Sequence, residues 1–261
     1  MNFKISIGFG ILLLLIWISA PALAVKVIDE DFNEPTEDFT YNGSAIQQLK
    51  LGVVLLTQTV EWQAGSLFFN TPYDVSAFKA RFDFWMGKGT GADGLTFAVL
   101  DSAVSGPGSL GGNGGCLGYW GLSGFAIEFD TWQNIDMEDP SENHVGVDID
   151  GSTVSIWTNS DIPELEDSPG KFRAIIFFRN GEIKVFLRNR GLGYPWAKIV
   201  DFTIPDFIAF KGYFGFTAAT GGETNYHLID NFSLNILTVP GAPAKNDVSI
   251  ATTWGDLKTK D

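Results

Sequence analysis

The chain has 261 residues, of which 17 are Lys or Arg and 31 are Asp or Glu, so its formal net charge is −14. This acidic balance argues against nucleic acid or an anionic membrane surface as a partner, because both repel a negatively charged protein. The single cysteine, Cys116, excludes an intrachain disulfide, so a core built from the 22 Phe and the other apolar residues must hold the fold.

The first 24 residues have the pattern of a secretory signal peptide. Lys4 gives a positive start, an apolar run extends from Ile5 to Ala20, and Ala22-Leu23-Ala24 fits a small-x-small cleavage site. We expect cleavage after Ala24, a secreted or periplasmic location, and no membrane insertion of the mature protein. An uncleaved anchor is the alternative, because the apolar run approaches the length of a spanning helix. Removing residues 1–24 leaves 16 basic and 31 acidic residues, a formal charge of 16 − 31 = −15.

Glycines and prolines divide the remaining chain into short segments, many of which alternate apolar and polar residues as half-buried strands do. We expect about twelve to fourteen strands in two stacked antiparallel sheets, which makes residues 25–238 one all-β sandwich domain. Residues 239–261 are small and charged and are expected to form a linker and a short C-terminal tail. The predicted strands are 25–32, one or two within 45–56, 66–69, 78–86, 95–100, 125–129, 144–148, 171–178, 182–188, 198–204, 213–219 and 225–236.

Two local signals refine this pattern. Asn180-Gly181 lies between two alternating segments, which is the strongest short signal for a hairpin. Nine glycines between Ser105 and Gly124 mark a long loop within the run of strands. A flexible linker is less expected there than a loop whose backbone comes close to another part of the molecule.

The stretch from Glu128 to His144 concentrates groups that bind cations. Glu128 and Asp130 end one strand, His144 opens the next, and the loop between them contains Asn134 and Asp139. Carboxylate and amide oxygens suit calcium, and an imidazole nitrogen suits a transition metal such as manganese. The pattern predicts a site for one or two divalent cations; a solvated acidic loop with a structural histidine is the alternative.

Four motifs resemble the legume-type (L-type) lectins, in the order that this family has. The stretch from Glu128 to His144 is the specific one, because residue types and spacing agree across seventeen positions. The resemblance implies a concanavalin A-like jelly-roll β-sandwich, in an exported, bacterial-style homologue. The motifs are Ala92-Asp93-Gly94, Gly114-Gly115-Cys116-Leu117-Gly118, Glu128 to Asn134 with Asp139-Pro140 and His144 to Asp148, and Gly215 to Gly222 with His227 to Ser233.

The resemblance also implies a set of metal ligands. Glu128, Asp130, Asp139 and His144 resemble the ligands of the transition-metal site, usually Mn²⁺. Asp130, Asn134, Asp139 and the backbone carbonyl of Trp132 resemble the ligands of Ca²⁺. Asp130 and Asp139 would then bridge the two ions, each carboxylate having two oxygens.

In this family a sugar binds beside the calcium. Asp93, the Gly115 amide and the Asn134 side chain resemble the groups that hold its hydroxyls, and Trp132 would offer an aromatic face. Gly221 and Gly222 lie in the predicted rim loop, residues 219–223. The resemblance implies a cis peptide before Asp93, glycans or glycoconjugates as partners, and a homodimer formed through the sheet away from the site.

Two other functions are open. A glycoside hydrolase on a similar sandwich would carry Glu-x-Asp-x-x-Glu on one strand, and here Gln133 replaces the second glutamate, which removes the acid/base. A structural or adhesive domain without sugar binding is the other alternative. Among the remaining polar groups, we expect His227 and Cys116 to be buried, and Asp148 and Asp150 to lie in turns or on the surface.

Overall fold

The computed structural model describes residues 23–238, which form sixteen strands and two short 3₁₀ segments, η1 (Gly114–Cys116) and η2 (Ile135–Met137). The predicted leader lies outside the described residues except for Leu23 and Ala24, which open the first strand, and the tail at 239–261 lies outside them entirely. The strands are β1 (Leu23–Glu30), β2 (Phe39–Gly43), β3 (Ile46–Gln48), β4 (Val53–Thr57), β5 (Ala64–Phe69), β6 (Tyr73–Asp74), β7 (Ala77–Gly87), β8 (Gly94–Asp101), β9 (Gly124–Asp130), β10 (His144–Ile149), β11 (Trp157–Asn159), β12 (Phe172–Arg179), β13 (Glu182–Asn189), β14 (Ala197–Thr203), β15 (Lys211–Ala219) and β16 (Tyr226–Thr238).

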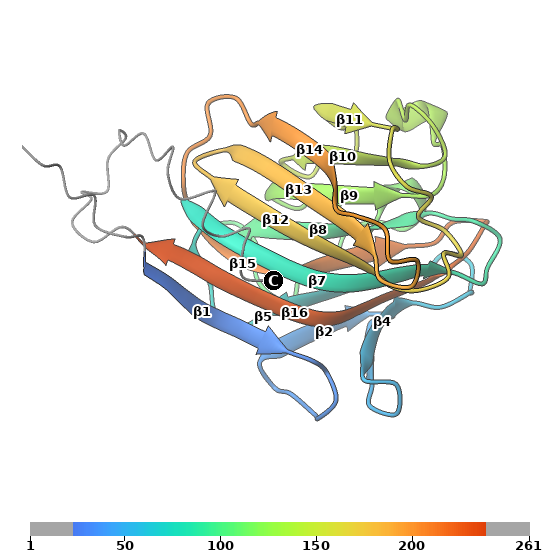
Figure 1. The fold of residues 1–261 in the computed structure, drawn as a ribbon, viewed down its shortest axis with the longest axis horizontal. Coiled ribbons are helices and arrows are strands. Elements are labelled where there is room, and N and C mark those ends of the chain that lie inside the picture. Colours follow the sequence, from blue (N-terminus) through green and yellow to red (C-terminus); the bar gives the residue numbers. More distant parts are fainter. Residues whose placement is uncertain (1–22, 239–261) are drawn as a thin grey trace, which may run out of the picture. The chain divides into compact units, whose positions relative to one another are not determined.

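The strands form two sheets of eight, stacked as two layers (Figure 1). Sheet A has the order β14-β13-β12-β7-β16-β4-β3, with β1 also paired to β16. Sheet B has the order β11-β10-β9-β8-β15-β5-β2, with β6 also paired to β15. The pairings along both orders are antiparallel. The predicted all-β sandwich of two antiparallel sheets is therefore confirmed.

Three strands were absent from the prediction: β2, β6 and β11. β2 and β11 are the two edges of sheet B, where one side of a strand has no neighbour. Their side chains are mostly half-buried and do not alternate between buried and exposed. β6 has only two residues. Edge strands are short and polar in many proteins, so the alternation that reveals a central strand is missing from them.

The core between the sheets is aromatic. Along β7 the side chains of Phe78, Phe82 and Phe84 are fully buried, and between Phe78 and Phe82 lie the half-buried basic residues Lys79 and Arg81. The Phe82 ring stacks on Phe97 of β8 with centroids 5.7 Å apart and meets Phe216 of β15 edge to face at 4.8 Å. Burying one such side chain contributes about 1.5–3 kcal/mol, so this core can stabilise the fold without a disulfide.

A second, smaller cluster lies on the opposite face of sheet B, where the glycine-rich loop folds over it. Tyr119 and Leu122 of the loop pack on Phe68, Ala98, Leu100 and Ala126. The Thr217 hydroxyl of β15 donates to the Leu117 carbonyl at 2.7 Å. Gly118 has a φ of +68°, and a Cβ there would lie 3.0 Å from the Ala218 carbonyl oxygen. The expected close backbone approach is thus confirmed.

No helix among residues 23–238 has the length and the apolar character needed to cross a membrane.

Replacing Phe97 tests the aromatic core. Phe97→Ala should lower the free energy of unfolding by about 3–5 kcal/mol, because it leaves a cavity between the sheets. Ile208→Ala is the control, since Ile208 is 83% exposed and its loss should change stability by about 0.5 kcal/mol or less. Urea unfolding of both variants measures the difference; equal midpoints would contradict this account of the core.

Candidate functional site

One row of antiparallel pairing in sheet B brings the ends of five strands together. His144 pairs with Asp130, Asp130 with Gly94, Gly94 with Ala219, and Ala219 with Ala64. Because antiparallel neighbours run in opposite directions, the loops that leave or enter this row all lie at the same end of the sheet. These loops are 58–63, 88–93, 131–143 and 220–225.

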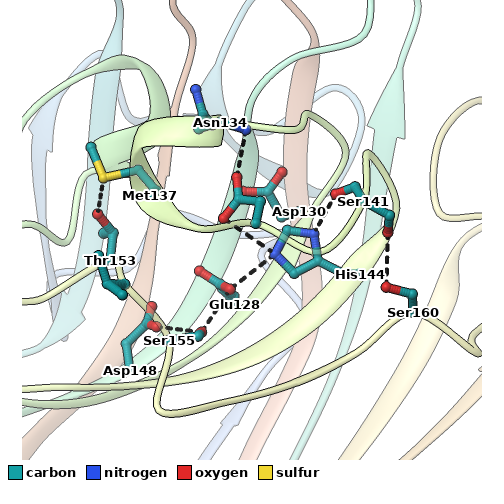
Figure 2. Close-up of polar contacts among 12 residues, drawn as sticks. Glu128, Asp130, Asn134, Met137, Ser141, His144, Asp148, Thr153, Ser155 and Ser160 are labelled. Carbon is teal, nitrogen blue, oxygen red and sulfur yellow. Dashed lines mark hydrogen bonds and ion pairs between the residues drawn. The ribbon is translucent and has the colours of Figure 1, made fainter.

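Alternation along β9 places its two acidic residues on the face opposite the main core. Ile127 and Phe129 point into the core, so Glu128 and Asp130 point outward. His144 stands across the ladder from Asp130. Ligand atoms of Glu128, Asp130 and His144 lie within 4.8 Å of one another, and all three residues are buried (Figure 2).

Gly146 makes room for this cluster. It pairs with Glu128 across the ladder, and a Cβ there would lie 2.1 Å from Glu128 Oε1 and 2.0 Å from Ser155 Oγ. Both distances are far below contact distance, so the Glu128 carboxylate occupies its position only because residue 146 has no side chain. Glycine is therefore required at position 146 because the Glu128 carboxylate fills the space of a side chain.

The His144 ring is oriented by both of its nitrogens. Nδ1 lies 2.9 Å from the Ser141 carbonyl oxygen, which can only accept, so this nitrogen carries a proton. Nε2 lies 3.2 Å from Glu128 Oε1 and 3.7 Å from Asp139 Oδ1. Burial disfavours the charged ring, but the hydrogen bond and charge of Glu128 and the charge of Asp139 raise the pKa of His144. A position facing Nε2 and two carboxylates attracts a proton or a metal cation.

Backbone amides of the loop after β9 donate hydrogen bonds to two nearby carboxylates. The Trp132 N–H donates to Asp130 Oδ1 at 2.7 Å, and the Asn134 N–H donates to Asp139 Oδ2 at 2.6 Å. Burial and the charge of Glu128 raise the pKa of Asp130 well above its usual range, and burial raises the pKa of Asp139 to about 6. Negative charge is therefore costly here, and a bound divalent cation would relieve it.

Asp93 enters the same region from the loop between β7 and β8. The Ala92–Asp93 peptide is cis, as predicted. The Asp93 carbonyl accepts the Thr131 N–H and hydroxyl at 2.9 and 2.8 Å, which ties this loop to the one after β9. Asp93 is 3% exposed, and burial raises the pKa of its carboxyl to about 7.

Two buried oxygens of the predicted site residues, Asp93 Oδ2 and Asn134 Oδ1, have no hydrogen-bond partner among residues 23–238, and Asp148 Oδ2 is a third such oxygen nearby. Buried acceptors without a hydrogen bond are uncommon in folded proteins, because each one costs about 1–3 kcal/mol of stability. They lie beside a cluster of carboxylates and an imidazole whose donors match calcium and a transition metal. The residues present therefore fit a bound cation and a ligand that donates hydrogen bonds.

The predicted glycines lie beside these two oxygens. A Cβ on Gly115 would lie 2.6 Å from Asn134 Oδ1, and one on Gly221 would lie 3.2 Å from Asp93 Oδ2. The Gly114 N–H donates to the Thr220 carbonyl at 2.9 Å, which holds the glycine-rich loop against the loop after β15. The structure thus gathers all the predicted site residues at one end of sheet B, with Gly222 and Trp132 exposed at the margin.

Asp148 was wrongly expected in a turn or on the surface. It is fully buried on β10, and burial with the charge of Glu128 raises its pKa well above the usual range. Ser155 Oγ lies 2.7 Å from Asp148 Oδ1 and 2.8 Å from Glu128 Oε1 (Figure 2). Asp148 shares the face of His144, two strand periods away, so strict period-two counting would have found it. Asp150 is exposed in a turn, as expected.

Three other expectations concern residues around the site. Cys116 was expected to be buried, but it is only partly buried in η1. His227 is fully buried as expected; its Nδ1 lies 2.6 Å from Thr57 Oγ1, and burial lowers its pKa to about 3. Gln133 is exposed, and its side-chain amide donates to the Asp139 carbonyl at 3.1 Å.

A comparison with protein families finds a match to the legume lectin beta-barrel domain over residues 30–233. A probable L-type lectin-domain containing receptor kinase, S.7, of Arabidopsis thaliana is 27% identical over 255 residues, covering 83% of this chain and 37% of the kinase. A serine-rich adhesin for platelets of Staphylococcus aureus is 27% identical over 236 residues, covering 78% of this chain and 17% of the adhesin. The chain thus spans about a third or less of the length of these relatives.

Solved structures share the fold. The basic winged bean lectin with Tn-antigen superposes with a TM-score of 0.69 at 22% identity, covering 85% of this chain and all of that one. The exoplasmic/lumenal domain of VIP36, in a Ca²⁺/Man₃GlcNAc-bound form, gives a TM-score of 0.62 at 19% identity, covering 81% and 89%. At these sequence identities, the structural similarity establishes only that the chain shares the β-sandwich fold of these proteins.

The buried acids predict how the stability of the metal-free protein depends on pH. Asp93, Asp130 and Asp139 have pKa values raised above 3.8 in the folded state. Between pH 4 and about 7 these acids make the folded state bind more protons than the unfolded state. Buried His227 acts in the opposite direction, because its pKa is lowered to about 3, but it is one group against three acids, so stability should fall as pH rises. His144 has the same sign as the acids, because its raised pKa means that its contribution is lost with rising pH. Thermal unfolding in chelator from pH 4.5 to 7.5 should show the fall.

Asp93→Asn should make this fall shallower, because it removes one of the titrating groups. A melting midpoint of the chelated wild type that rises across the whole window would contradict the pKa shifts.

Proposed function

Because the chain belongs to the L-type lectin family, we propose that it binds carbohydrate without catalysis, at the end of sheet B and in a metal-dependent way. The observation that carries this proposal is the pair of orphaned buried oxygens, Asp93 Oδ2 and Asn134 Oδ1, beside a cluster of metal-ligating side chains. Acceptors of this kind suit sugar hydroxyls and hydrated cations, both of which donate hydrogen bonds.

Two cations would share the carboxylates. Mn²⁺, or another transition metal, would take Glu128, Asp130, Asp139 and His144. Ca²⁺ would take Asp130, Asp139, Asn134 and the Trp132 carbonyl. Burial, and then repulsion between carboxylates, raise the pKa values of Asp130 and Asp139. Three carboxylates carry −3 against +4 from two dications, so the ions would offset both effects.

The sugar would lie beside the calcium. The Asp93 carboxylate would accept hydrogen bonds from its hydroxyls, while the Gly115 N–H and the Asn134 amide would donate to it. Trp132, 38% exposed, would cover the C–H side of the ring. Gly221 and Gly222 would form the rim, where the lack of side chains keeps Asp93 within reach of the ligand.

The similar proteins support this class of ligand and leave the sugar open. The VIP36 domain was solved with Ca²⁺ and Man₃GlcNAc, a Bauhinia forficata lectin with GalNAc, and the winged bean lectin with Tn-antigen. These are different ligands on one fold, so the fold alone does not decide which sugar binds. The adhesin among the relatives makes an adhesive role compatible with sugar binding.

A glycoside hydrolase is the weaker reading. Gln133 supplies no carboxylate, and its side chain binds the Asp139 carbonyl in its own loop. The acids beside Glu128 are Asp130 and Asp148, and all three residues are buried, with at most 2% exposed. Cleavage needs two carboxylates that flank a bound substrate, whereas the Glu128 carboxylate is close to Asp130 and His144 and accepts the Ser155 hydroxyl. We retain three further predictions: the protein is exported, it forms a homodimer, and a domain at residues 25–238 is followed by a separate tail.

Glycan binding should require Asp93. Asp93→Ala should lower binding on a glycan array at least about a hundredfold, because one residue accepts several sugar hydroxyls in a buried site. Glu142→Ala is the matched control, since Glu142 is an exposed acid in the neighbouring metal loop. Chelation of the wild type should also abolish binding, and added Ca²⁺ with Mn²⁺ should restore it. Binding that persists in chelator would refute the metal dependence.

Metal uptake should require Gly146. Gly146→Ala places a methyl group where Glu128 Oε1 lies, so the carboxylate must move and the transition-metal affinity should fall about tenfold or more. Gly106→Ala is the control, because a Cβ there meets nothing within 4 Å. Elemental analysis and calorimetric titration with Mn²⁺ measure the effect. Equal Mn²⁺ affinity in the two variants would argue against Glu128 as a ligand.

A further inference from the structure

A tryptophan that the sequence did not single out lies exposed beside the proposed sugar site. Trp62 belongs to the loop between β4 and β5, which lies at the same end of sheet B as the site. It is 62% exposed although indole is among the largest apolar groups, so packing into the core does not account for its position. A single exposed aromatic residue is not by itself a binding surface, so the groove beside Trp62 and the loop that carries it decide its role.

The Trp62 loop is held firmly against the rim of the site. The Trp62 N–H donates to the Gly221 carbonyl at 3.0 Å, and the Asn113 side chain donates to the Trp62 carbonyl at 3.2 Å. The Thr220 hydroxyl donates to the Val60 carbonyl at 2.7 Å and accepts the Gln63 N–H at 3.0 Å. These bonds fix the backbone on both sides of Trp62, so the loop that carries the ring need not be ordered when a ligand binds.

Beside Trp62 runs a groove of about 770 Å³, which is large enough for a sugar unit. Trp62 and Val60 give it an apolar side, and Thr59, Thr90 and Thr224 add hydroxyl groups. An aromatic face combined with hydroxyl groups matches a sugar ring, which has one C–H face and a polar edge.

Two glutamates add a charge preference. Glu61 and Glu223 both line the groove, and both can accept hydrogen bonds from sugar hydroxyls. They would repel a sugar that carries a carboxylate or sulfate, and the formal net charge of −14 acts in the same direction.

Two consecutive glycines join this groove to Asp93. A Cβ on Gly221 would lie 3.2 Å from Asp93 Oδ2, and one on Gly222 would lie 4.0 Å from Trp62 Cζ2. Consecutive Cα atoms are about 3.8 Å apart. Gly222, which lines the groove, therefore lies only one residue along the chain from Gly221, which lies beside the Asp93 carboxylate. No side chain at 221 or 222 separates the two places.

We propose that Trp62 and this groove form a second sugar subsite, so that the protein recognises neutral oligosaccharides of at least two units over the single sugar. This rests on the proposed function, because the first unit occupies the site at Asp93 and Asn134. The second unit stacks on Trp62 and bonds the threonine and glutamate side chains of the groove.

The test is a competition assay with metal-loaded protein against free mono-, di- and trisaccharides of mannose, glucose, galactose and N-acetylhexosamines. For the sugar that binds, the wild type should prefer the oligosaccharide to its single unit by about tenfold, a gain typical of one aromatic stack. Trp62→Ala should reduce this preference to about twofold or less, and Trp62→Phe, which keeps a ring, should retain most of it. A disaccharide with a uronic acid as the second unit should show no preference.

Tyr194→Ala is the matched control, since Tyr194 is an aromatic residue that is 57% exposed on the loop between β13 and β14 of sheet A. Its ratio of oligosaccharide to monosaccharide affinity should equal that of the wild type. An unchanged ratio in a folded Trp62→Ala variant overturns the second subsite and leaves the proposed function standing. A folded, metal-loaded wild type that binds none of the sugars overturns both.

Discussion

The site depends on one row of hydrogen-bonded pairing across sheet B. His144, Asp130, Gly94, Ala219 and Ala64 are aligned in that row. A slip of one residue between β9 and β10 would turn Glu128 and Asp130 into the core and remove His144 from its partners. The aromatic core fixes the register, because Ile127 and Phe129 can be buried in only one of the two phases. Stability and the position of the functional groups thus come from the same packing.

Electrostatics works against the site when no cation is bound. Burial in this corner raises the pKa values of Asp93, Asp130, Asp139 and Asp148, since charged carboxylates lose hydration and repel one another. The fold tolerates this through hydrogen bonds from backbone amides and Ser155, and through the space at Gly146. A group of acids held together at such a cost suits cations, whose charge turns the repulsion into attraction. Metal binding and order in the loop at 131–143 are expected to be coupled for this reason.

Loops from distant parts of the chain complete the site by fastening to one another. The glycine-rich loop crosses the outer face of sheet B on its own small cluster around Tyr119 and brings Gly115 to Asn134. The loop after β15 then holds two neighbours at once, because Thr220 accepts the Gly114 N–H at its carbonyl and binds Val60 through its hydroxyl. These contacts bring the loops that carry Asp93, Asn134 and Trp62 together at one end of sheet B.

The class of fold and most of the residues gathered at the site could be predicted from local patterns in the sequence. Period-two alternation revealed the central strands, and the spacing from Glu128 to His144 indicated a cation site, because both signals are local in the chain. The edge strands β2 and β11, the burial of Asp148 and the position of Trp62 were decided only by the tertiary structure. Edge strands lack a buried second side, Asp148 is buried by loops that fold over β10, and Trp62 meets Gly221 across a separation of 159 residues in the numbering (221 − 62). Contacts of this kind depend on register and on loop closure, which no single stretch of sequence encodes.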